Sequence, residues 1–271
     1  MRKYYTRACN FYYGNYAKKL LSKKNAYPLA GNSSIVFDQI EIFQRKKKGK
    51  ILSNTYSISE FENFDKKIKK LINQDLKKII SQLKNICGLK FDNPEIMVVL
   101  NITPDSFSDG GLFYDEKKAN NQIKQMLESG ASIIDIGGES TRPGSKTITE
   151  SNEWSRINGV ISEFKKKFPK AILSLDTRKS EVMNKGIKHG IDIINDVSGF
   201  NFDKKSFHVV KSKKIPLILH HMQGTPNTMQ KNPIYDDVLS DIFDFFESKI
   251  KFFTKVGYKK KLIILYPGIG F

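Results

Sequence analysis

The chain has 271 residues, of which 39% are hydrophobic and 11% aromatic, so it has ample material for a packed core and wholesale disorder is excluded. Its formal net charge is +18, but 40 of its 46 basic residues are Lys, a bias typical of codon usage rather than of nucleic-acid recognition. No run approaches 18 consecutive apolar residues, and Cys9 and Cys87 are too few and too distant for a disulfide scaffold. We expect a cytoplasmic protein with no nucleic-acid or membrane partner.

The first 95 residues carry no evident chemistry. Residues 34–43, SIVFDQIEIF, alternate as a strand does. Ser59 and Glu62 have the spacing of a helix capping box, and apolar residues then recur at three- and four-residue spacing over 68–86. That pattern predicts a long amphipathic helix with a Lys-rich, solvated outer face. We interpret residues 1–95 as an accessory N-terminal segment.

From residue 96 onward, short apolar strands alternate with amphipathic helices. Strands are predicted at 96–100, 132–136, 172–176, 191–195, 216–220 and 262–266, and helical patterns are clearest at 117–129, 151–168, 179–189 and 235–256. Strands that are apolar on both faces and separated by helices indicate a parallel sheet. No GxGxxG motif follows the first strand, so a dinucleotide-binding start is not indicated.

A polar residue ends nearly every predicted strand, and these residues are Asn101, Asp135, Asp176, Asn195, His220 and His221. In a (β/α)8 barrel of the TIM type, such strand ends converge on one mouth, where active sites are built. The fold class predicted for residues 96–271 is therefore α/β, a TIM-type (β/α)8 barrel. Because six strands are found where a barrel has eight, we expect it to be incomplete at its C-terminal end.

Two loops have compositions that suit bound ions. Residues 101–111, NITPDSFSDGG, gather hard oxygen ligands of the kind that Mg²⁺ prefers, although an ordinary turn that caps a helix would also account for them. Residues 137–145, GGESTRPGS, combine glycines, hydroxyls and Arg142, which suits an anion such as phosphate. The adjacent His220 and His221 must point to opposite sides of their strand, so at most one faces the pocket.

Two further strand ends suit an organic ring. Asp176 and Asn195 are expected to point toward the same mouth. A carboxylate and an amide can bracket a heterocycle with alternating donors and acceptors, such as an aminopyrimidinone. We interpret the neighbouring Thr177 and Asp196 as structural capping residues.

Together the motifs closely resemble those of dihydropteroate synthase, a folate-pathway enzyme. They are NITPDSFSDGG (101–111), DIGGESTRPG (135–144), LDT (175–177), INDVSG (194–199) and HMQGTP (221–226), in this order. The resemblance covers about residues 96–271. It implies a (β/α)8 barrel and the Mg²⁺-assisted condensation of (7,8-dihydropterin-6-yl)methyl diphosphate with 4-aminobenzoate, which gives dihydropteroate and diphosphate.

The resemblance also implies roles for single residues. Asn101 would be the Mg²⁺ ligand. Catalytic roles would fall to residues of the two loops, Asp105, Ser108, Asp109 and Arg142. Substrate would be bound by Phe107, Thr141, Pro143, Asp176, Asn195 and His221. The partners implied are the two small-molecule substrates, and because dimerisation is common in the family, a homodimer is an expectation.

The sequence departs from the family pattern in three places. Tyr266 stands where the family has Asp before PGxGF, and His220 stands where it usually has Met. The seventh and eighth strands, with the family's late basic residues, are not found. We therefore expect a chain that is truncated after the sixth strand and has little synthase activity by itself.

Other interpretations remain open. The chain could be the pterin- or folate-binding domain of a methyltransferase, or a non-enzymatic protein, either a gene remnant or a lysine-rich binder of nucleic acid. The SFSDGG and GGESTRPGS segments favour the synthase, because methyl transfer from a folate requires no diphosphate site. The intact motif loops argue against a remnant.

Overall fold

The chain divides into two compact units. A computed structural model describes residues 3–46, 51–103, 112–140, 147–225, 228–230 and 232–269. The first unit comprises residues 1–85, 90–92 and 235–244, and the second comprises 86–89, 93–234 and 245–271. The division at residues 95 and 96 into separate domains stays a prediction. Within the described ranges, no helix is both long and apolar enough to cross a lipid bilayer.

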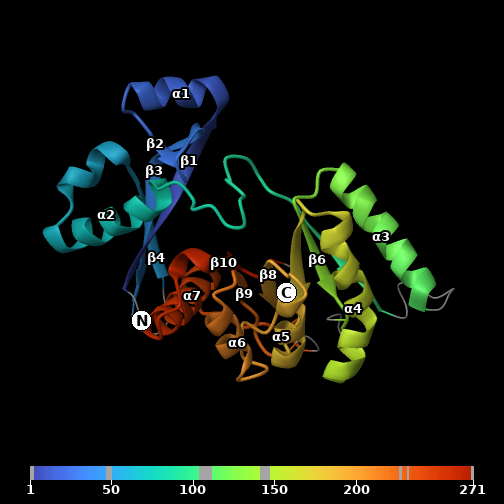
Figure 1. The fold of residues 1–271 in the computed structure, drawn as a ribbon. Coiled ribbons are helices and arrows are strands. Elements are labelled where there is room, and N and C mark those ends of the chain that lie inside the picture. Colours follow the sequence, from blue (N-terminus) through green and yellow to red (C-terminus); the bar gives the residue numbers. More distant parts are fainter. Residues whose placement is uncertain are drawn as a thin grey trace. The chain divides into compact units, whose positions relative to one another are not determined.

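The first unit is built on an antiparallel sheet, drawn in blue in Figure 1. Its strands are β1 (Tyr4–Tyr13), β2 (Tyr27–Leu29), β3 (Asn32–Arg45) and β4 (Ile51–Ser57), and its helices are α1 (Gly14–Ser22) and α2 (Lys66–Ile80). Strand β3, which contains the predicted strand, pairs with β1 along one edge and with β2 and β4 along the other. Phe37 and Ile40 of β3 pack in one core cluster with Ile72 and Leu76 of α2.

The start of α2 differs from the prediction. Its N-cap is Asp65, whose side chain accepts hydrogen bonds from the backbone N–H groups of the first turn. A capping box does precede it, but it belongs to the 3₁₀ helix η2 (Ile58–Asn63) and joins Ser57 to Glu60. The predicted start of the helix after Ser59 is therefore wrong: Ser59 lies inside η2, and this extra turn precedes the helix. The sequence pattern S-x-x-E fits Ser57 with Glu60 as well as Ser59 with Glu62.

The second unit contains a six-stranded parallel sheet. Its strands are β5 (Met97–Asn101), β6 (Ile133–Gly137), β7 (Ile172–Asp176), β8 (Ile193–Asp196), β9 (Leu217–His220) and β10 (Ile263–Tyr266), side by side in chain order. Each begins within two residues of its predicted start, which confirms the predicted α/β class and parallel sheet. Among these described strands, β5 and β10 each pair with one neighbour only.

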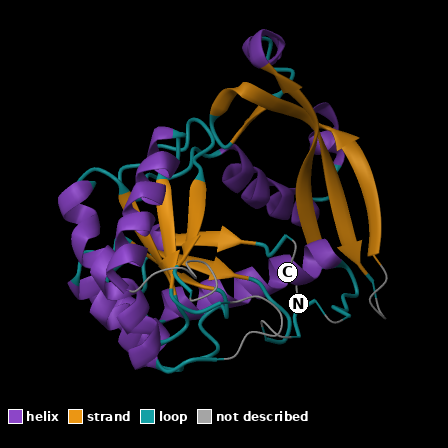
Figure 2. Cartoon of the chain, turned by 90° about the vertical axis from the view of Figure 1, so that its right-hand side faces the viewer, coloured by secondary structure: helices purple, strands orange, loops and turns teal. Residues whose placement is uncertain are grey.

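Five helices connect the six strands and pack beside them (Figure 2). They are α3 (Leu112–Glu128), α4 (Glu150–Lys167), α5 (Ser180–Lys188), α6 (Ser206–Lys213) and α7 (Val238–Lys255). All but α6 lie close to the predicted helical ranges. Helix α7 begins in the first unit and ends in the second, so the boundary between the units falls inside one continuous helix.

The two faces of the parallel sheet bury different sets of side chains. Ile133, Ile172, Ile193 and Ile218 form one apolar cluster on the inner face. The outer face packs on the helices, and Gly186 of α5 lies close to Leu175 of β7 on that face. Because side chains alternate along each strand, the polar residues toward the carboxyl ends stand on the same inner face as the isoleucines.

Gly186 offers a test of this packing. A Cβ atom there would lie 2.5 Å from Leu175 Cδ2 and 3.2 Å from Ile191 Cγ1. We expect Gly186→Ala to lower the free energy of unfolding by about 1–3 kcal/mol, despite the better helix propensity of Ala, because the buried neighbours must move. Urea denaturation followed by circular dichroism measures the change. Lys185→Ala, on the solvent side of α5, should stay within about 0.5 kcal/mol of the native chain, and equal stability of the two variants would contradict the prediction.

Candidate functional site

Four strand ends stand in one row at the carboxyl edge of the parallel sheet. Asn101 pairs in register with Gly137, Gly137 with Asp176, and Asp176 with Asn195. A Cβ on Gly137 would lie 3.3 Å from Asn101 Oδ1 and 3.5 Å from Asp176 Cβ, so these two side chains flank the glycine from both sides. The structure therefore brings together three of the predicted site residues, Asn101, Asp176 and Asn195.

A chain of buried hydrogen bonds is centred on Asn195, the last residue of this row. Asn195 donates from Nδ2 to Asp135 Oδ2 at 2.8 Å, and its Oδ1 lies 2.6 Å from His220 Nε2. Asp135, Asn195 and His220 are only 1%, 4% and 7% exposed. The imidazole ring of His220 in turn contacts the ring of Tyr266 with a centroid separation of 4.5 Å. Side chains from β6, β8, β9 and β10 thus form one connected wall of the inner face.

Burial perturbs the ionisable groups of this wall. Burial raises the pKa of Asp135, opposed by its polar neighbours Ser174 and Asn195. It also lowers the pKa of His220 to about 4, so the imidazole is neutral at physiological pH. The pKa of Asp176 is raised well above its usual value, first by burial and then by the negative charge of Asp135 and of other carboxylates around it. Carboxylates perturbed in this way are typical of functional sites.

The two adjacent histidines take different surroundings, as strand alternation requires. His220 is the one that joins the buried wall. The ring of His221 packs edge-on against Phe245 of α7, with centroids 5.1 Å apart, and its backbone N–H donates to the carbonyl of Tyr266. Burial lowers the pKa of His221, opposed by a hydrogen bond with the backbone of Pro267. The structure does not bring the His221 ring together with Asn195, and its role in substrate binding stays a prediction.

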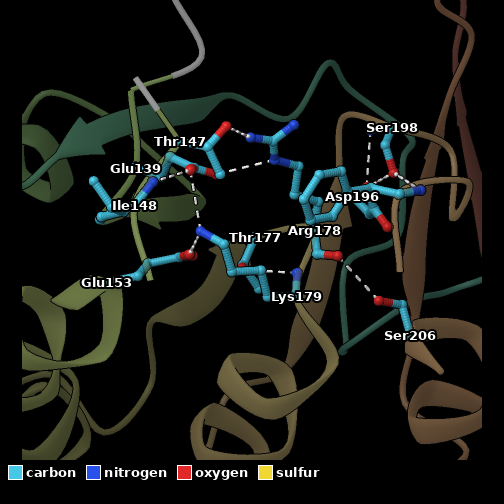
Figure 3. Close-up of polar contacts among 12 residues, drawn as sticks. Glu139, Thr147, Ile148, Glu153, Thr177, Arg178, Lys179, Asp196, Ser198 and Ser206 are labelled. Carbon is cyan, nitrogen blue, oxygen red and sulfur yellow. Dashed lines mark hydrogen bonds and ion pairs between the residues drawn. The ribbon is translucent and has the colours of Figure 1, made fainter. Parts of the chain in front are cut away.

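A second buried cluster links the loops that follow β6 and β7 (Figure 3). Lys179 lies between two carboxylates: its Nζ is 3.1 Å from Glu139 Oε1 and forms a short hydrogen bond with Glu153. Glu139 also accepts from Arg178 Nε at 3.0 Å and from the backbone N–H of Ile148 at 3.0 Å. Glu139 therefore ties the segments before and after residues 141–146 to the loop after β7.

The two carboxylates of this cluster respond differently to burial. Burial would raise the pKa of Glu139, but hydrogen bonds from Arg178, Ile148 and Lys179 outweigh it and hold the pKa below its usual value. Glu153 is completely buried, and burial raises its pKa despite the hydrogen bond from Lys179. Lys179 is the cation that the two carboxylates share, and Arg178 also compensates the charge of Glu139.

Asp196 and Thr177 have structural roles, but the expectation that they cap helices is wrong, because each accepts hydrogen bonds within a local turn and the N-cap of α5 is Lys179. Asp196 Oδ1 accepts from the backbone N–H and the hydroxyl of Ser198, at 2.8 and 2.6 Å. Its pKa is raised to about 6, chiefly by burial, with the Ser198 hydrogen bonds opposing the shift. Thr177 Oγ1 accepts from the backbone N–H of Lys179.

The remaining predicted site residues lie outside the described part of the chain. They are Asp105, Phe107, Ser108, Asp109, Thr141, Arg142 and Pro143. Conversely, the sequence analysis did not assign site roles to Asp135 or His220, although both were noted at strand ends. It missed the cluster around Lys179 altogether, since no spacing rule links Glu139, Glu153 and Lys179.

Comparison with known proteins gives a consistent result. The family model for pterin binding enzymes matches residues 97–271. The curated dihydropteroate synthase of Synechocystis sp. is 40% identical over 176 residues, which are 65% of this chain and 61% of that protein. The chain spans about three fifths of the length of the curated relatives that it matches.

Solved structures agree with the sequence relatives. A dihydropteroate synthase from Clostridium difficile, solved in the presence of pteroic acid, matches with a TM-score of 0.59 and 38% identity over 65% of this chain and 65% of that one. The enzyme from Xanthomonas albilineans, solved with 4-aminobenzoic acid, matches with a TM-score of 0.61 and 35% identity over 68% of this chain and 65% of that one.

Lys179 allows the buried cluster to be tested. Lys179→Met leaves Glu139 and Glu153 buried without their shared cation, so we expect a loss of about 3–5 kcal/mol in the free energy of unfolding at neutral pH. The loss should shrink as the pH falls, because protonation removes the uncompensated charge. Urea unfolding at neutral and at mildly acidic pH measures both effects. Lys185→Met makes the same chemical change at an exposed pair on α5, and a similar loss in both variants would contradict the prediction.

Proposed function

We propose that this chain, which belongs to the family of pterin binding enzymes, serves the dihydropteroate synthase reaction. In that reaction (7,8-dihydropterin-6-yl)methyl diphosphate and 4-aminobenzoate condense to dihydropteroate and diphosphate. The observation that carries the proposal is the row of Asn101, Asp176 and Asn195 at the carboxyl edge of the sheet. Its support is the name shared by the relatives, together with the pteroic acid and 4-aminobenzoic acid present in two of the solved structures.

The pterin ring would be recognised by Asp176 and Asn195. An ionised carboxylate accepts two N–H donors, and a primary amide offers both a donor and an acceptor, which complements the edge of an aminopyrimidinone. The isoleucine cluster beneath them supplies an apolar floor for the flat ring. The raised pKa of Asp176 would relax on binding, because ligand donors favour the charged form.

Asn101 fits the role of Mg²⁺ ligand. Its amide oxygen lies beside Gly137, where a Cβ atom would stand only 3.3 Å from it, so the glycine leaves this oxygen uncovered. Over the described residues, no group of three or more His, Cys, Asp or Glu could hold a metal ion by itself. Mg²⁺ commonly keeps several waters and binds through few protein groups together with substrate phosphate, which such a donor set allows. When bound, Mg²⁺ would supply charge neutralisation for the departing diphosphate.

The chain's own residues would act mainly by orienting the pterin substrate relative to the attacking amine. The bond between the pterin methylene carbon and the diphosphate oxygen breaks, the amine nitrogen of 4-aminobenzoate bonds to that carbon, and the nitrogen loses a proton. Asp176 and Asn195 would hold the ring so that the methylene faces the amine. For the two loops we carry forward the roles proposed from the sequence. Catalytic roles fall to Asp105, Ser108, Asp109 and Arg142, and substrate binding to Phe107, Thr141 and Pro143, together with His221 of the strand end.

We further propose that β5 to β10 are six consecutive strands of a (β/α)8 barrel. A closed barrel requires its strands to be staggered. The proposal is supported by the offset between β8 and β9, where Asn195 pairs in register with the apolar residue Ile218 rather than with a polar one. The homodimer remains an expectation from the resemblance.

The proposed Mg²⁺ role predicts a Mg²⁺-dependent affinity. In calorimetric titrations of residues 1–271, we expect the dihydropterin diphosphate to bind more tightly with Mg²⁺ than without it. Asn101→Ala should remove that difference and weaken binding about tenfold, the value of one ligand contact of about 1.4 kcal/mol. Asn121→Ala, at an exposed position on α3, is the matched control and should behave as the unmodified chain.

Two outcomes would count against this function. No binding by a chain shown to be folded by circular dichroism would refute the pterin site. Equally tight binding of a dihydropterin that lacks the diphosphate, with no effect of Mg²⁺, would favour the methyltransferase alternative.

Asp176 predicts a pH dependence of binding. Because its pKa is raised, the carboxyl group becomes protonated at a higher pH than an ordinary aspartate does, and a protonated carboxyl can no longer accept two donors. We therefore expect pterin affinity to fall as the pH is lowered, and to begin falling at a higher pH than an ordinary carboxylate would cause. Asp176→Asn should bind more weakly and show a flatter profile. Calorimetric titration at a series of pH values measures both, and a parallel fall in the variant would assign the pH dependence to another group.

A further inference from the structure

Two residues that depart from the family pattern are direct neighbours. His220 ends β9, Tyr266 ends β10, and the two are partners in the parallel register. Their rings are in contact, with centroids 4.5 Å apart and planes inclined by 52°. The resemblance places Met and Asp at these positions. The chain has thus replaced two adjacent side chains of the wall, and the replacements touch each other.

The first of these replacements forms a hydrogen bond that a methionine could not. His220 Nε2 lies 2.6 Å from Asn195 Oδ1, while the Nδ2 group of the same amide donates to Asp135 at 2.8 Å. A neutral imidazole carries one N–H, and an amide oxygen can only accept. The short contact therefore identifies Nε2 as the protonated nitrogen of His220.

We propose that His220 is a positioning residue, which fixes the side-chain amide of Asn195 in the orientation that recognises the pterin ring. This inference rests on the proposed function. It concerns how the pterin ring is recognised rather than which group reacts, because His220 acts through Asn195.

The amide has only one favourable orientation between these two partners. Turning it by half a rotation would place the amide oxygen against the Asp135 carboxylate, which is a repulsive contact in a buried site. It would also require His220 to move its proton from Nε2 to Nδ1, so that Nε2 could accept from the amide N–H. With His220 present, Asp135 and His220 hold the amide from both ends.

Asn195 still has recognition capacity after these two bonds. Its nitrogen has a second hydrogen and its oxygen a second lone pair. A donor and an acceptor that are held side by side in fixed order can discriminate the edge of an aminopyrimidinone from that of a ring with the opposite pattern. The Tyr266 ring packs on the imidazole and restrains its rotation. Fixing the amide before binding also lowers the entropy that binding must overcome.

Substitutions at position 220 separate this role from simple packing. His220→Met introduces an apolar side chain of similar length that has no hydrogen-bond donor. His220→Gln places an amide N–H near the position of Nε2. In calorimetric titrations of residues 1–271 with the dihydropterin diphosphate and Mg²⁺, we expect His220→Met to weaken binding about tenfold and His220→Gln to recover most of the loss. His208→Met, at an exposed position on α6, is the matched control and should bind as the unmodified chain does.

A spectroscopic measurement on the ligand-free protein supplies a readout that packing alone would not move. Nitrogen-15 NMR should show the His220 ring protonated at Nε2, and Asn195→Ala should shift that signal. A ring protonated at Nδ1 would contradict the inference. So would unchanged affinity in His220→Met, or a glutamine variant that binds no better than the methionine variant.

The two hypotheses fail in distinguishable ways. If the folded, unmodified chain does not bind the pterin, the proposed function fails and the positioning role for this ligand falls with it. If the unmodified chain binds and the substitutions at His220 have no effect, the proposed function stands and the inference alone is wrong.

Discussion

The candidate site depends on the register of the parallel sheet. Side chains of a strand alternate between the two faces, so a shift of one residue in any strand would turn its polar end away from the others. The observed register aligns Asn101, Gly137, Asp176 and Asn195 in one row. The same register buries the isoleucine cluster deeper on that face. The polar edge and its apolar floor are therefore consequences of one backbone arrangement, held by the whole sheet rather than by a single loop.

The sequence predicted this sheet well because its signal is local. Strands that are apolar on both faces and bounded by helices have few alternatives, and all six lie where the pattern placed them. The first unit was harder to predict, because β1 is rich in Tyr and only β3 alternates clearly. The alternation of side chains along a strand also showed that His220 and His221 must point to opposite faces of the sheet. It could not show which one faces inward, because that depends on how β9 pairs with β8 and β10.

Long-range electrostatics was the part that the sequence could not predict. Glu139, Glu153 and Lys179 come from a loop, a helix and the start of another helix, and only the folded chain brings them together (Figure 3). Burying such charges is costly unless each is compensated, so the cluster contributes specificity of arrangement more than net stability. It holds Glu139, which follows β6, against Arg178 and Lys179 of the loop after β7. Residues that are distant in the chain are thereby joined at the carboxyl edge of the sheet.

The absence of a side chain at Gly137 has a consequence for the codon of this residue. Every amino acid that a missense change can introduce there brings a Cβ into the gap between Asn101 and Asp176. Glycine codons begin with two guanines, and no synonymous change can replace either one. Any missense change at this codon therefore adds a side chain whose Cβ would stand 3.3 Å from Asn101 Oδ1. Nucleotide variation at codon 137 would therefore record whether selection still maintains the site.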